Sequence, residues 1–176
     1  MIKLIPVTNT DELNDDLKQI YIDSFPSDER RDWLELKKLI NHPNFSFNQV
    51  LNNEKIIGLI TIWNLPKCVF IEHFAIHESL RSKGIGTQVF MKIMVEKPSN
   101  IILEVEEATT EAAQRRITFY ERLGFSICDG IYYQPAYSPD KNKVKLLLMS
   151  YPELLIPYDF EEIKTQIYRF VYNYTE

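Results

Sequence analysis

A run of six residues, Arg81-Ser82-Lys83-Gly84-Ile85-Gly86, has the composition of a turn that binds a diphosphate. It lies between an aromatic and β-branched run, residues 69–76, and an apolar run with helical spacing. A strand that leads directly into a helix exposes the first helical amides, which have no intrahelical acceptor and carry the positive end of the helix dipole. Glycines leave these amides uncovered, and the Arg and Lys add positive charge. The pattern predicts an anion site, although a short Gly-x-Gly also occurs in ordinary loop-to-helix turns.

Two motifs of this chain resemble those of the GNAT acyltransferase superfamily. Arg81-x-x-Gly84-x-Gly86 is similar to the acetyl-CoA pyrophosphate motif, Gln/Arg-x-x-Gly-x-Gly/Ala. The segment Phe119-Tyr120-Glu121-Arg122-Leu123-Gly124-Phe125 resembles the later helix-to-strand motif, and with their flanks the two motifs cover residues 65–135. The resemblance implies an α/β (α+β) GNAT fold. This fold has a mixed, mostly antiparallel central sheet flanked by helices, here with an additional C-terminal helix.

The same resemblance implies the activity and the cofactor. A GNAT N-acetyltransferase passes the acetyl group of acetyl-CoA directly to an amine of a small molecule, a peptide or a protein, without an acyl-enzyme. Main-chain groups of the strand before the turn would bond the pantetheine arm as a neighbouring strand would. The residues expected to contact acetyl-CoA are Phe74, Ala75, Ile76, Arg81, Ser82, Lys83, Gly84, Ile85, Gly86, Thr87 and Arg116.

Tyr120 matches the tyrosine that, in many GNAT enzymes, donates a proton to the departing thiolate. A phenol keeps its proton at neutral pH, which suits this role, and the alternative is an ordinary core aromatic on the inner face of a helix. The chain departs from the superfamily at Ala113, where asparagine is frequent. Arg115 and Arg116 follow, and they either meet CoA phosphates or form ion pairs with Glu111 or the acidic strand end.

Three glutamates are candidates for the general base. An amine with a pKa near ~10.4 is mostly cationic at neutral pH, so a carboxylate acting directly or through water is expected to take its proton. Glu72 is the first choice, because it shares a strand face with Phe70 and Phe74, where apolar surroundings would favour its protonated form. Its alternative role is a strand carboxylate that faces solvent or pairs with a lysine. Glu104 and Glu106 share a face of the next strand, and either of them can be the base or bind a cationic substrate.

The acceptor amine is expected to contact two segments besides the strand that carries Glu104. The resemblance places the aromatic loop at residues 132–137 and the stretch 24–31 near the acceptor. A loop packed under the C-terminal helix and a capped helix start are the alternative explanations of these two segments. Three scattered histidines without a matching ligand predict no metal site. The candidate substrate-binding residues are Glu29, Glu104 and Tyr133.

The composition predicts one core-forming domain. A chain of 176 residues with 45% hydrophobic side chains suffices for one core. We expect an N-acetyltransferase domain over residues 1–150 and an amphipathic helix over 151–176 that packs on this domain or on a second subunit, which leaves a homodimer open.

The net charge of −5 argues against a nucleic-acid partner and fits an amine substrate. The two cysteines lack metal or redox spacing, and no apolar run has the length of a signal or membrane segment, so we expect a cytoplasmic protein without a membrane partner.

Hydrophobic spacing and capping residues locate the elements. Thr10 is expected to cap a first helix that ends near Ser24, and Ser27 a second one before Pro43. A hairpin is expected across Asn52-Asn53. The later elements expected are a helix from about Gly86, a strand over 101–105, a helix capped by Thr109 or Thr110, and a terminal hairpin of residues 125–133 and 143–149.

Two other functions fit the same motifs. One is a catalytically silent CoA-binding sensor or interaction module that acts through its C-terminal helix. The other is a nucleotide-phosphate domain, which needs a longer Gly-rich loop or an acidic ribose ligand that this sequence lacks. The identity of the acceptor amine is not predicted by the sequence, because loops select it.

Overall fold

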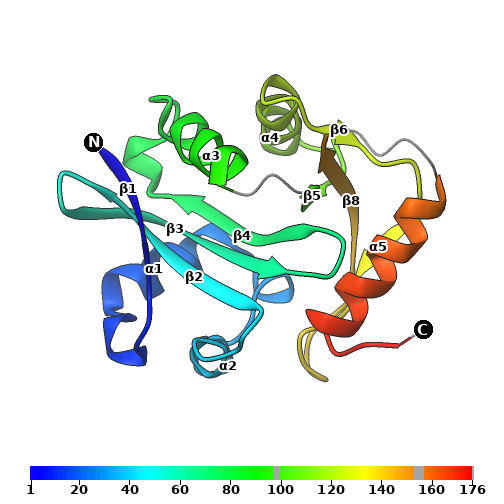
Figure 1. Ribbon diagram of the computed structural model, residues 1–176, viewed down its shortest axis with the longest axis horizontal. Helices are drawn as coiled ribbons and strands as arrows, with labels where there is room; N and C mark the ends of the chain where they lie inside the picture. Colours follow the sequence, from blue (N-terminus) through cyan, green and yellow to red (C-terminus); the bar gives the residue numbers. More distant parts are fainter. Residues whose placement is uncertain (97–99, 153–156, 176) are drawn as a thin grey trace. The chain divides into compact units, whose positions relative to one another are not determined.

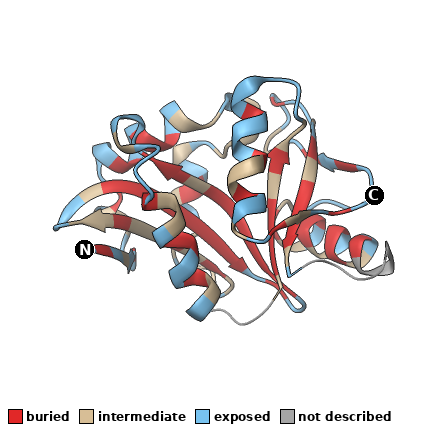
Figure 2. Ribbon diagram, turned by 90° about the horizontal axis from the view of Figure 1, so that it is seen from above, coloured by how far each residue is buried: buried red, intermediate tan, exposed pale blue. Residues whose placement is uncertain are grey.

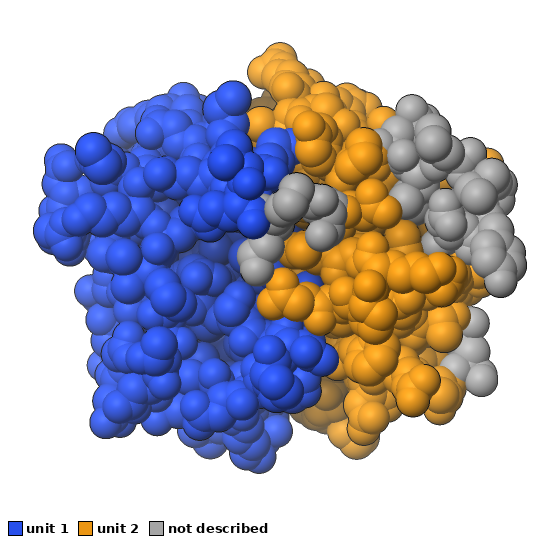
Figure 3. All heavy atoms as spheres, in the orientation of Figure 1, with its two compact units in different colours: residues 1–63, 71–98 blue, residues 64–70, 99–176 orange. Residues whose placement is uncertain are grey.

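The computed structural model describes residues 1–96, 100–152 and 157–175. These residues form eight strands and five α-helices, and the strand pairs with a defined register are antiparallel. The α/β (α+β) class expected from the sequence is therefore confirmed. The chain divides into two compact units, unit 1 (residues 1–63 and 71–98) and unit 2 (residues 64–70 and 99–176), which are coloured separately in Figure 3. No described helix is long and apolar enough to cross a membrane.

Unit 1 is built on four strands that follow one another in the sheet in chain order. They are β1 (Ile2–Pro6), β2 (Phe45–Asn52), β3 (Lys55–Asn64) and β4 (Val69–Ile76). Most residues of β3 and β4 are buried on both strand faces, as is typical of strands covered by helices on both sides. In Figure 1, α3 (Ile85–Glu96) lies on one face of these strands, and α1 (Asp15–Ser24) and α2 (Trp33–Lys38) lie on the other.

Unit 2 is centred on β8 (Val144–Tyr151). The strand β5 (Ile101–Glu106) pairs with it on one side, and β6 (Ser126–Ile127) and β7 (Tyr132–Gln134) also pair with it. The helix α4 (Glu111–Arg122) contacts β5. The final helix, α5 (Pro157–Phe170), buries an apolar stripe that is visible in Figure 2. The buried residues of this stripe are Phe160, Ile163, Ile167 and, just after the helix, Val171.

The first two predicted helix starts are wrong. Thr10 opens only a 3₁₀ turn, Thr10–Glu12, and α1 begins later, where the side chain of Asn14 accepts a hydrogen bond from the amide of Leu17 at 3.1 Å. Ser27 likewise opens a 3₁₀ turn, Ser27–Glu29, and α2 follows Asp32. Asn, Asp, Ser and Thr all favour helix starts, so where several occur close together the sequence does not select among them.

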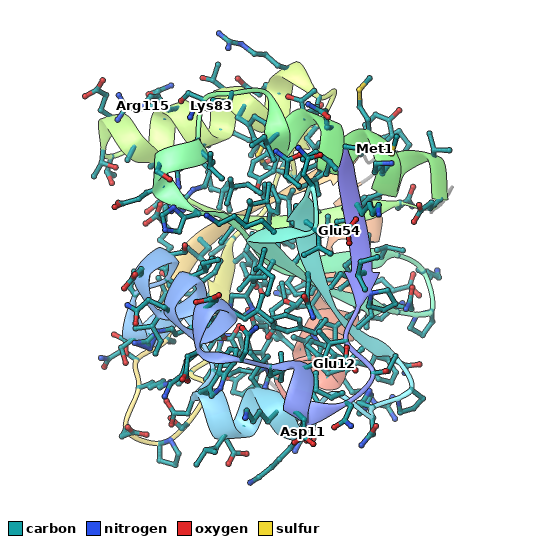
Figure 4. All side chains as sticks on the ribbon, turned by 90° about the vertical axis from the view of Figure 1, so that its left-hand side faces the viewer. Met1, Asp11, Glu12, Glu54, Lys83 and Arg115 are labelled. Carbon is teal, nitrogen blue, oxygen red and sulfur yellow. The ribbon has the colours of Figure 1, made fainter. Side chains whose placement is uncertain are left out.

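The predicted hairpin is correct, but its turn lies one residue later. Asn52 pairs with Lys55, and the two turn residues are Asn53 and Glu54, with φ of 49° and 65°. Two successive left-handed residues are the mark of the hairpin turn whose twist matches its strands. The N-terminal ammonium group of Met1 donates to the Asn53 side chain at 2.9 Å, and Lys3 pairs with Glu54 at 2.5 Å. Met1 and Glu54 are labelled in Figure 4.

The strand expected over residues 125–133 is interrupted. It forms the two short strands β6 and β7, and between them lies Gly130. A Cβ on Gly130 would overlap the ring of Phe160, so the interruption makes room for α5. Two other local predictions are confirmed, because Thr110 caps α4 through the amide of Ala113 and Gly124 ends it with φ of 89°. The helix expected from Gly86 begins at Ile85.

Candidate functional site: a glycine turn in unit 1 and two hydrogen-bonded glutamates

The predicted diphosphate turn forms at the end of β4 in unit 1. After the short 3₁₀ turn Glu78–Leu80, Ser82 and Gly84 adopt left-handed φ values of 61° and 74°. The first helical hydrogen bond of α3 runs from the amide of Gln88 to the carbonyl of Gly84, at 3.2 Å. The amides of residues 85–87 therefore precede the first amide that has an intrahelical acceptor. A Cβ on Gly84 would meet no atom within 4 Å, so the space beside Gly84, at the start of the helix, is open.

The two cations of the turn have different roles in the present conformation. Arg81 donates from Nε to the carbonyl of Ile76 at 2.9 Å and from its terminal nitrogen to Ser24 at 3.3 Å, so it ties the turn to β4 and α1. Lys83 is exposed and donates to the carbonyl of Ser79 at 3.0 Å. Both positive charges therefore lie within the turn that carries the uncovered amides.

The last residues of β4 lie close to β3. A Cβ on Gly58 would overlap the carbonyl oxygen of Ala75, so only glycine permits this approach. Ala75 and Ile76 are buried, and Phe74 is partly exposed with its ring edge-on to Phe90, at 5.0 Å between centroids. Gly58 therefore allows β3 to lie close to residues 74–76, whose main chain is predicted to bind the pantetheine arm.

Glu72 lies at the centre of a buried polar network in unit 1. Its Oε1 accepts from Arg31 Nε at 2.9 Å and its Oε2 accepts from Trp63 Nε1 at 2.7 Å. The Glu72 side chain is fully buried, while that of Arg31 is 13% exposed. The surroundings thus differ from the apolar ones expected, because a guanidinium that lies far away in sequence reaches the carboxylate. The position of Glu72 on β4 alone does not reveal that partner.

His73, the next residue, connects β4 to the segment before α2. Its ring nitrogens lie 3.2 Å from the hydroxyl of Thr61 and 3.2 Å from the carbonyl of Glu29, and 3.4 Å from the hydroxyl of Tyr21. Burial lowers the pKa of His73 to about 4, although the nearby Glu72 opposes this shift. The imidazole is therefore neutral at physiological pH. The main-chain carbonyl of Glu29, a residue predicted to bind the acceptor amine, is thus part of this network.

Tyr120 lies in unit 2 on the inner face of α4. It is 6% exposed, and its ring packs against that of Phe125, which folds back after Gly124, with centroids 5.7 Å apart. Burial raises the pKa of Tyr120 to about 12, with a smaller opposing effect of Arg116. The phenol is therefore fully protonated at neutral pH, and the role assigned to it from the sequence stays a prediction.

The arginines of α4 form ion pairs in unit 2. Arg115 pairs with Glu111 one turn earlier, at 2.5 Å, and Arg116 pairs with Glu106 of β5 at 2.7 Å. Such ion pairs were predicted as the alternative to contacts between these arginines and the CoA phosphates. Glu106 is thus neutralised by α4, which directs attention to Glu104, the other carboxylate on that face of β5.

Glu104 accepts hydrogen bonds from two tyrosines. The hydroxyl of Tyr172 lies 2.9 Å from Oε1 and 3.0 Å from Oε2, and the hydroxyl of Tyr132 also donates to Oε1. Tyr133, the candidate acceptor residue beside it, is 38% exposed and carries the ammonium group of Lys143 over its ring at 5.1 Å. Sequence reasoning missed Tyr172, because it follows a helix far from any motif. Its only signal was the high tyrosine content of the C-terminal segment.

The candidate residues therefore fall into two groups that the two units hold separately. Unit 1 brings together the turn, the end of β4, Glu72 and the main chain of Glu29, whereas unit 2 contains Glu104, Arg116, Tyr120 and Tyr133. Within residues 1–96, 100–152 and 157–175, no three His, Cys, Asp or Glu side chains are grouped so as to hold a metal ion. Both cysteines are buried, which raises the pKa of each thiol.

The burial of neutral His73 predicts that stability falls in mild acid. The unfolded imidazole takes up a proton below its usual pKa of about 6.5, whereas the folded one does so only near 4. Because the unfolded state binds more protons in this window, the free energy of unfolding should decrease by roughly 2 kcal/mol from pH 7 to pH 5 through this group. Urea unfolding of the His73→Gln variant should lack this component, whereas the exposed His77→Gln control should keep it. Parallel pH curves for wild type and His73→Gln would contradict the assignment.

The buried ion pair predicts a strong effect of neutralising Glu72. Glu72→Gln keeps the size of the side chain but removes the buried negative charge that faces the guanidinium of Arg31. We expect the free energy of unfolding, measured in urea, to fall by about 3 kcal/mol. The matched control is Glu54→Gln, the same change in the exposed pair with Lys3, which should not alter stability measurably. Equal effects of the two substitutions would show that the network around Glu72 is not as described.

Comparison with known proteins connects this arrangement with a family. The model of the acetyltransferase (GNAT) family matches residues 10–125. No curated protein matches the chain. Among solved structures, a Bacteroides thetaiotaomicron protein assigned to the GNAT-family acetyltransferases is 30% identical, with 98% of this chain and 99% of that chain covered and a TM-score of 0.90.

Two more distant structures share the fold. A GNAT-family acetyltransferase from Elizabethkingia anophelis with acetyl-CoA bound is 15% identical, covers 85% of this chain and 96% of its own, and has a TM-score of 0.60. The ribosomal-protein-S18-alanine N-acetyltransferase of Escherichia coli is 20% identical, with 85% and 92% covered and a TM-score of 0.61. The family match over more than half of the chain and the near-complete alignment with the Bacteroides protein confirm the resemblance found in the two motifs. This chain belongs to the GNAT family of acetyltransferases.

Proposed function

We propose that this protein is an N-acetyltransferase that passes the acetyl group of acetyl-CoA directly to an amine. The observation that carries the proposal is the open turn before α3, where Gly84 has φ of 74° and leaves the space beside the helix amides uncovered. A diphosphate needs several amides and no side chain over them, which this turn offers. Family membership and the acetyl-CoA bound to the Elizabethkingia protein of the same fold support the same conclusion.

Acetyl-CoA would be held mainly by the main chain. The amides of residues 85–87 would bind the diphosphate, and the exposed Lys83 can exchange its carbonyl partner for a phosphate. Arg81 keeps the turn in shape through Ile76, so its contribution combines charge with positioning. The remaining residues proposed for acetyl-CoA are Phe74, Ala75, Ile76, Ser82, Gly84 and Arg116, of which Arg116 would have to leave its ion pair with Glu106.

Direct transfer needs one proton removed from the amine and one proton delivered to sulfur. Bound acetyl-CoA supplies the activated thioester, so that a C–N bond forms at its carbonyl carbon and the C–S bond breaks. Glu72 is the first proposed base, but it can act only if the contacts with Arg31 and Trp63 open. Glu104, or a water held by either carboxylate, is the alternative base. An acceptor that arrives as an ammonium ion first loses one proton to the base, and the second proton that its nitrogen loses during transfer balances the one that the free thiol gains.

Tyr120 is proposed to stabilise the departing sulfur. Because burial raises its pKa to about 12, the phenol holds its proton more firmly than a free thiol does, so full transfer from Tyr120 would be uphill. Its hydroxyl would instead donate a hydrogen bond to the developing thiolate until the proton released by the amine arrives. This role requires the O–H group and not merely an aromatic ring.

One observation favours the second function, a CoA-binding module without turnover. The Glu72 side chain is fully buried, and each of its oxygens accepts from a side-chain donor, which is the behaviour of a structural carboxylate. If Glu104 also lacks a catalytic role, the chain would bind acetyl-CoA and release no thiol. Calorimetry and a thiol-release assay together distinguish this module from the enzyme.

The first experiment measures acetyl-CoA binding by calorimetry. Gly84→Ala places a methyl group in the open space of the turn, and we expect it to weaken binding by about tenfold because the diphosphate is displaced from the amides. Gly124→Ala is the matched control, since that glycine is also left-handed, with φ of 89°, but ends α4. The control should bind acetyl-CoA as the wild type does. No heat with the wild type, or equal weakening in both variants, would contradict the predicted diphosphate site.

The second experiment follows thiol release from acetyl-CoA with spermidine, agmatine, tyramine and an alanine-starting peptide. Tyr120→Phe should lower kcat by about a hundredfold for any accepted amine, with an unchanged KM for acetyl-CoA, because the lost hydrogen bond acts on the departing sulfur. Tyr174→Phe, which removes a hydroxyl from a half-exposed ring, should keep the wild-type rate. An unaltered kcat in Tyr120→Phe would remove this role. Binding of acetyl-CoA without thiol release for any acceptor would favour the silent module.

A further inference from the structure

Arg31, Glu72 and Trp63 form a closed set of contacts in unit 1. Arg31 donates from Nε to Oε1 of Glu72 at 2.9 Å, and Trp63 donates from Nε1 to Oε2 at 2.7 Å. The guanidinium carbon of Arg31 also lies over the Trp63 ring, 5.8 Å from its centroid. Each of the three side chains therefore contacts the other two, at a carboxylate that is fully buried.

Glu72 and Trp63 present the groups that recognise a cation. A buried carboxylate attracts positive charge strongly because little water screens it, and the face of an indole also attracts ammonium and guanidinium groups. The N–H group of Trp63 holds one carboxylate oxygen, and the other oxygen accepts from the guanidinium. The two side chains thus have the composition of a cation-binding site, and its ligand in this conformation is an arginine of the same chain.

The main chain beside Arg31 is held independently of the arginine side chain. The amide of Arg31 donates to the hydroxyl of Tyr21 at 2.9 Å, and the carbonyl of Glu29 lies 3.2 Å from Nε2 of His73. Neither contact involves the guanidinium. Rotation of the Arg31 side chain can therefore take the guanidinium away from the carboxylate while residues 29–31 keep their place.

The arginine is the most exposed of the three side chains. The Arg31 side chain is 13% exposed, whereas that of Glu72 is fully buried and Trp63 is 1% exposed. Removing a cation from a buried carboxylate is costly, and a neutral or anionic ligand would not compensate that cost, whereas a second cation would. The arrangement therefore favours the exchange of one cation for another.

We propose that Glu72 and Trp63 form a cation-binding site in which Arg31 is an exchangeable internal ligand, replaced by the ammonium group of a cationic acceptor. This inference rests on the proposed function, of which it names the substrate class. It also names the event that frees Glu72 from Arg31, which is a condition for the use of Glu72 as a base. The site selects by charge, so that a cation binds and a neutral molecule of the same shape does not.

The first test fills the space left by a shortened Arg31. Arg31→Ala should lower the melting temperature, and millimolar acetamidinium, a planar cation, should raise it again by about 4 °C. Acetamide, a neutral molecule of the same shape, should have no effect, and adding Glu72→Gln to Arg31→Ala should remove the response to acetamidinium. The matched control is Arg169→Ala, which removes an exposed guanidinium from over the Phe170 ring, at 5.5 Å, and should not respond.

The second test measures binding of the four amines named above by calorimetry in the presence of CoA. Because Arg31 competes with the acceptor, Arg31→Ala should lower the dissociation constant of an accepted amine by about tenfold. Arg31→Gln, which keeps a long side chain with N–H donors but not the charge, should also lower it, and Arg169→Ala should match the wild type. If Arg31→Ala does not fold by itself, folding restored by acetamidinium and not by acetamide supports the inference, and Arg31→Gln then decides on amine binding.

The outcomes separate the inference from the function on which it rests. Equal responses of Arg31→Ala to acetamidinium and acetamide would overturn the inference, whether or not the wild type transfers acetyl groups. An amine dissociation constant that is unchanged or higher in the Arg31 variants would also overturn it, and acetyl transfer by the wild type would then leave the function standing. A response to acetamidinium alone and tighter amine binding, without acetyl transfer by the wild type, would support the inference and overturn the function.

Discussion

The uncovered amides at the start of α3 are the physical feature on which the functional assignment depends. A helix always begins with amides that have no intrahelical acceptor, and most proteins satisfy them with a capping side chain or water. Here the residue before the helix is Gly84, which has no side chain and a left-handed backbone. The two cations of the turn donate to nearby main-chain carbonyls, Arg81 to that of Ile76 and Lys83 to that of Ser79. The turn is thereby shaped before any anion arrives, which reduces the ordering cost of binding.

Glu72, which is buried, and Glu104, which is partly buried, differ in the side chains that donate to their carboxylates. Glu72 accepts from a guanidinium and an indole, so a cation within unit 1 compensates its charge. Glu104 accepts from two phenols, those of Tyr172 and Tyr132, which orient the carboxylate. The first arrangement holds a buried carboxylate in an ion pair, and the second holds a carboxylate through neutral hydroxyl donors. Residue type and strand position are alike for the two, so the difference arises from the partner side chains.

Local signals predicted local structure well at α4, where the two candidate caps, Thr109 and Thr110, are adjacent and one glycine follows the helix. Thr110 capped α4, and Gly124 adopted the left-handed conformation that ends it. The prediction failed where several equivalent residues were close together. Asn9, Thr10 and Asn14 can all begin a helix. In the structure, Asn14 caps α1, because its side chain accepts from the amide of Leu17. The turn of the first hairpin shifted by one residue for the same reason, because Asn52, Asn53 and Glu54 are all polar and the strand register chose the last two.

The sequence by itself determined the family, the α/β class and the glycine turn, because each follows from residues that are adjacent or nearly adjacent in the chain. It also located the carboxylates and the tyrosine from which a mechanism can be proposed. Only the tertiary structure decided that Arg31 lies on Glu72, that Arg116 neutralises Glu106, and that Tyr172 reaches Glu104 across 68 positions. The physical reason is that side-chain hydrogen bonds and ion pairs join residues that chain folding brings together, and no local pattern records such distant partners.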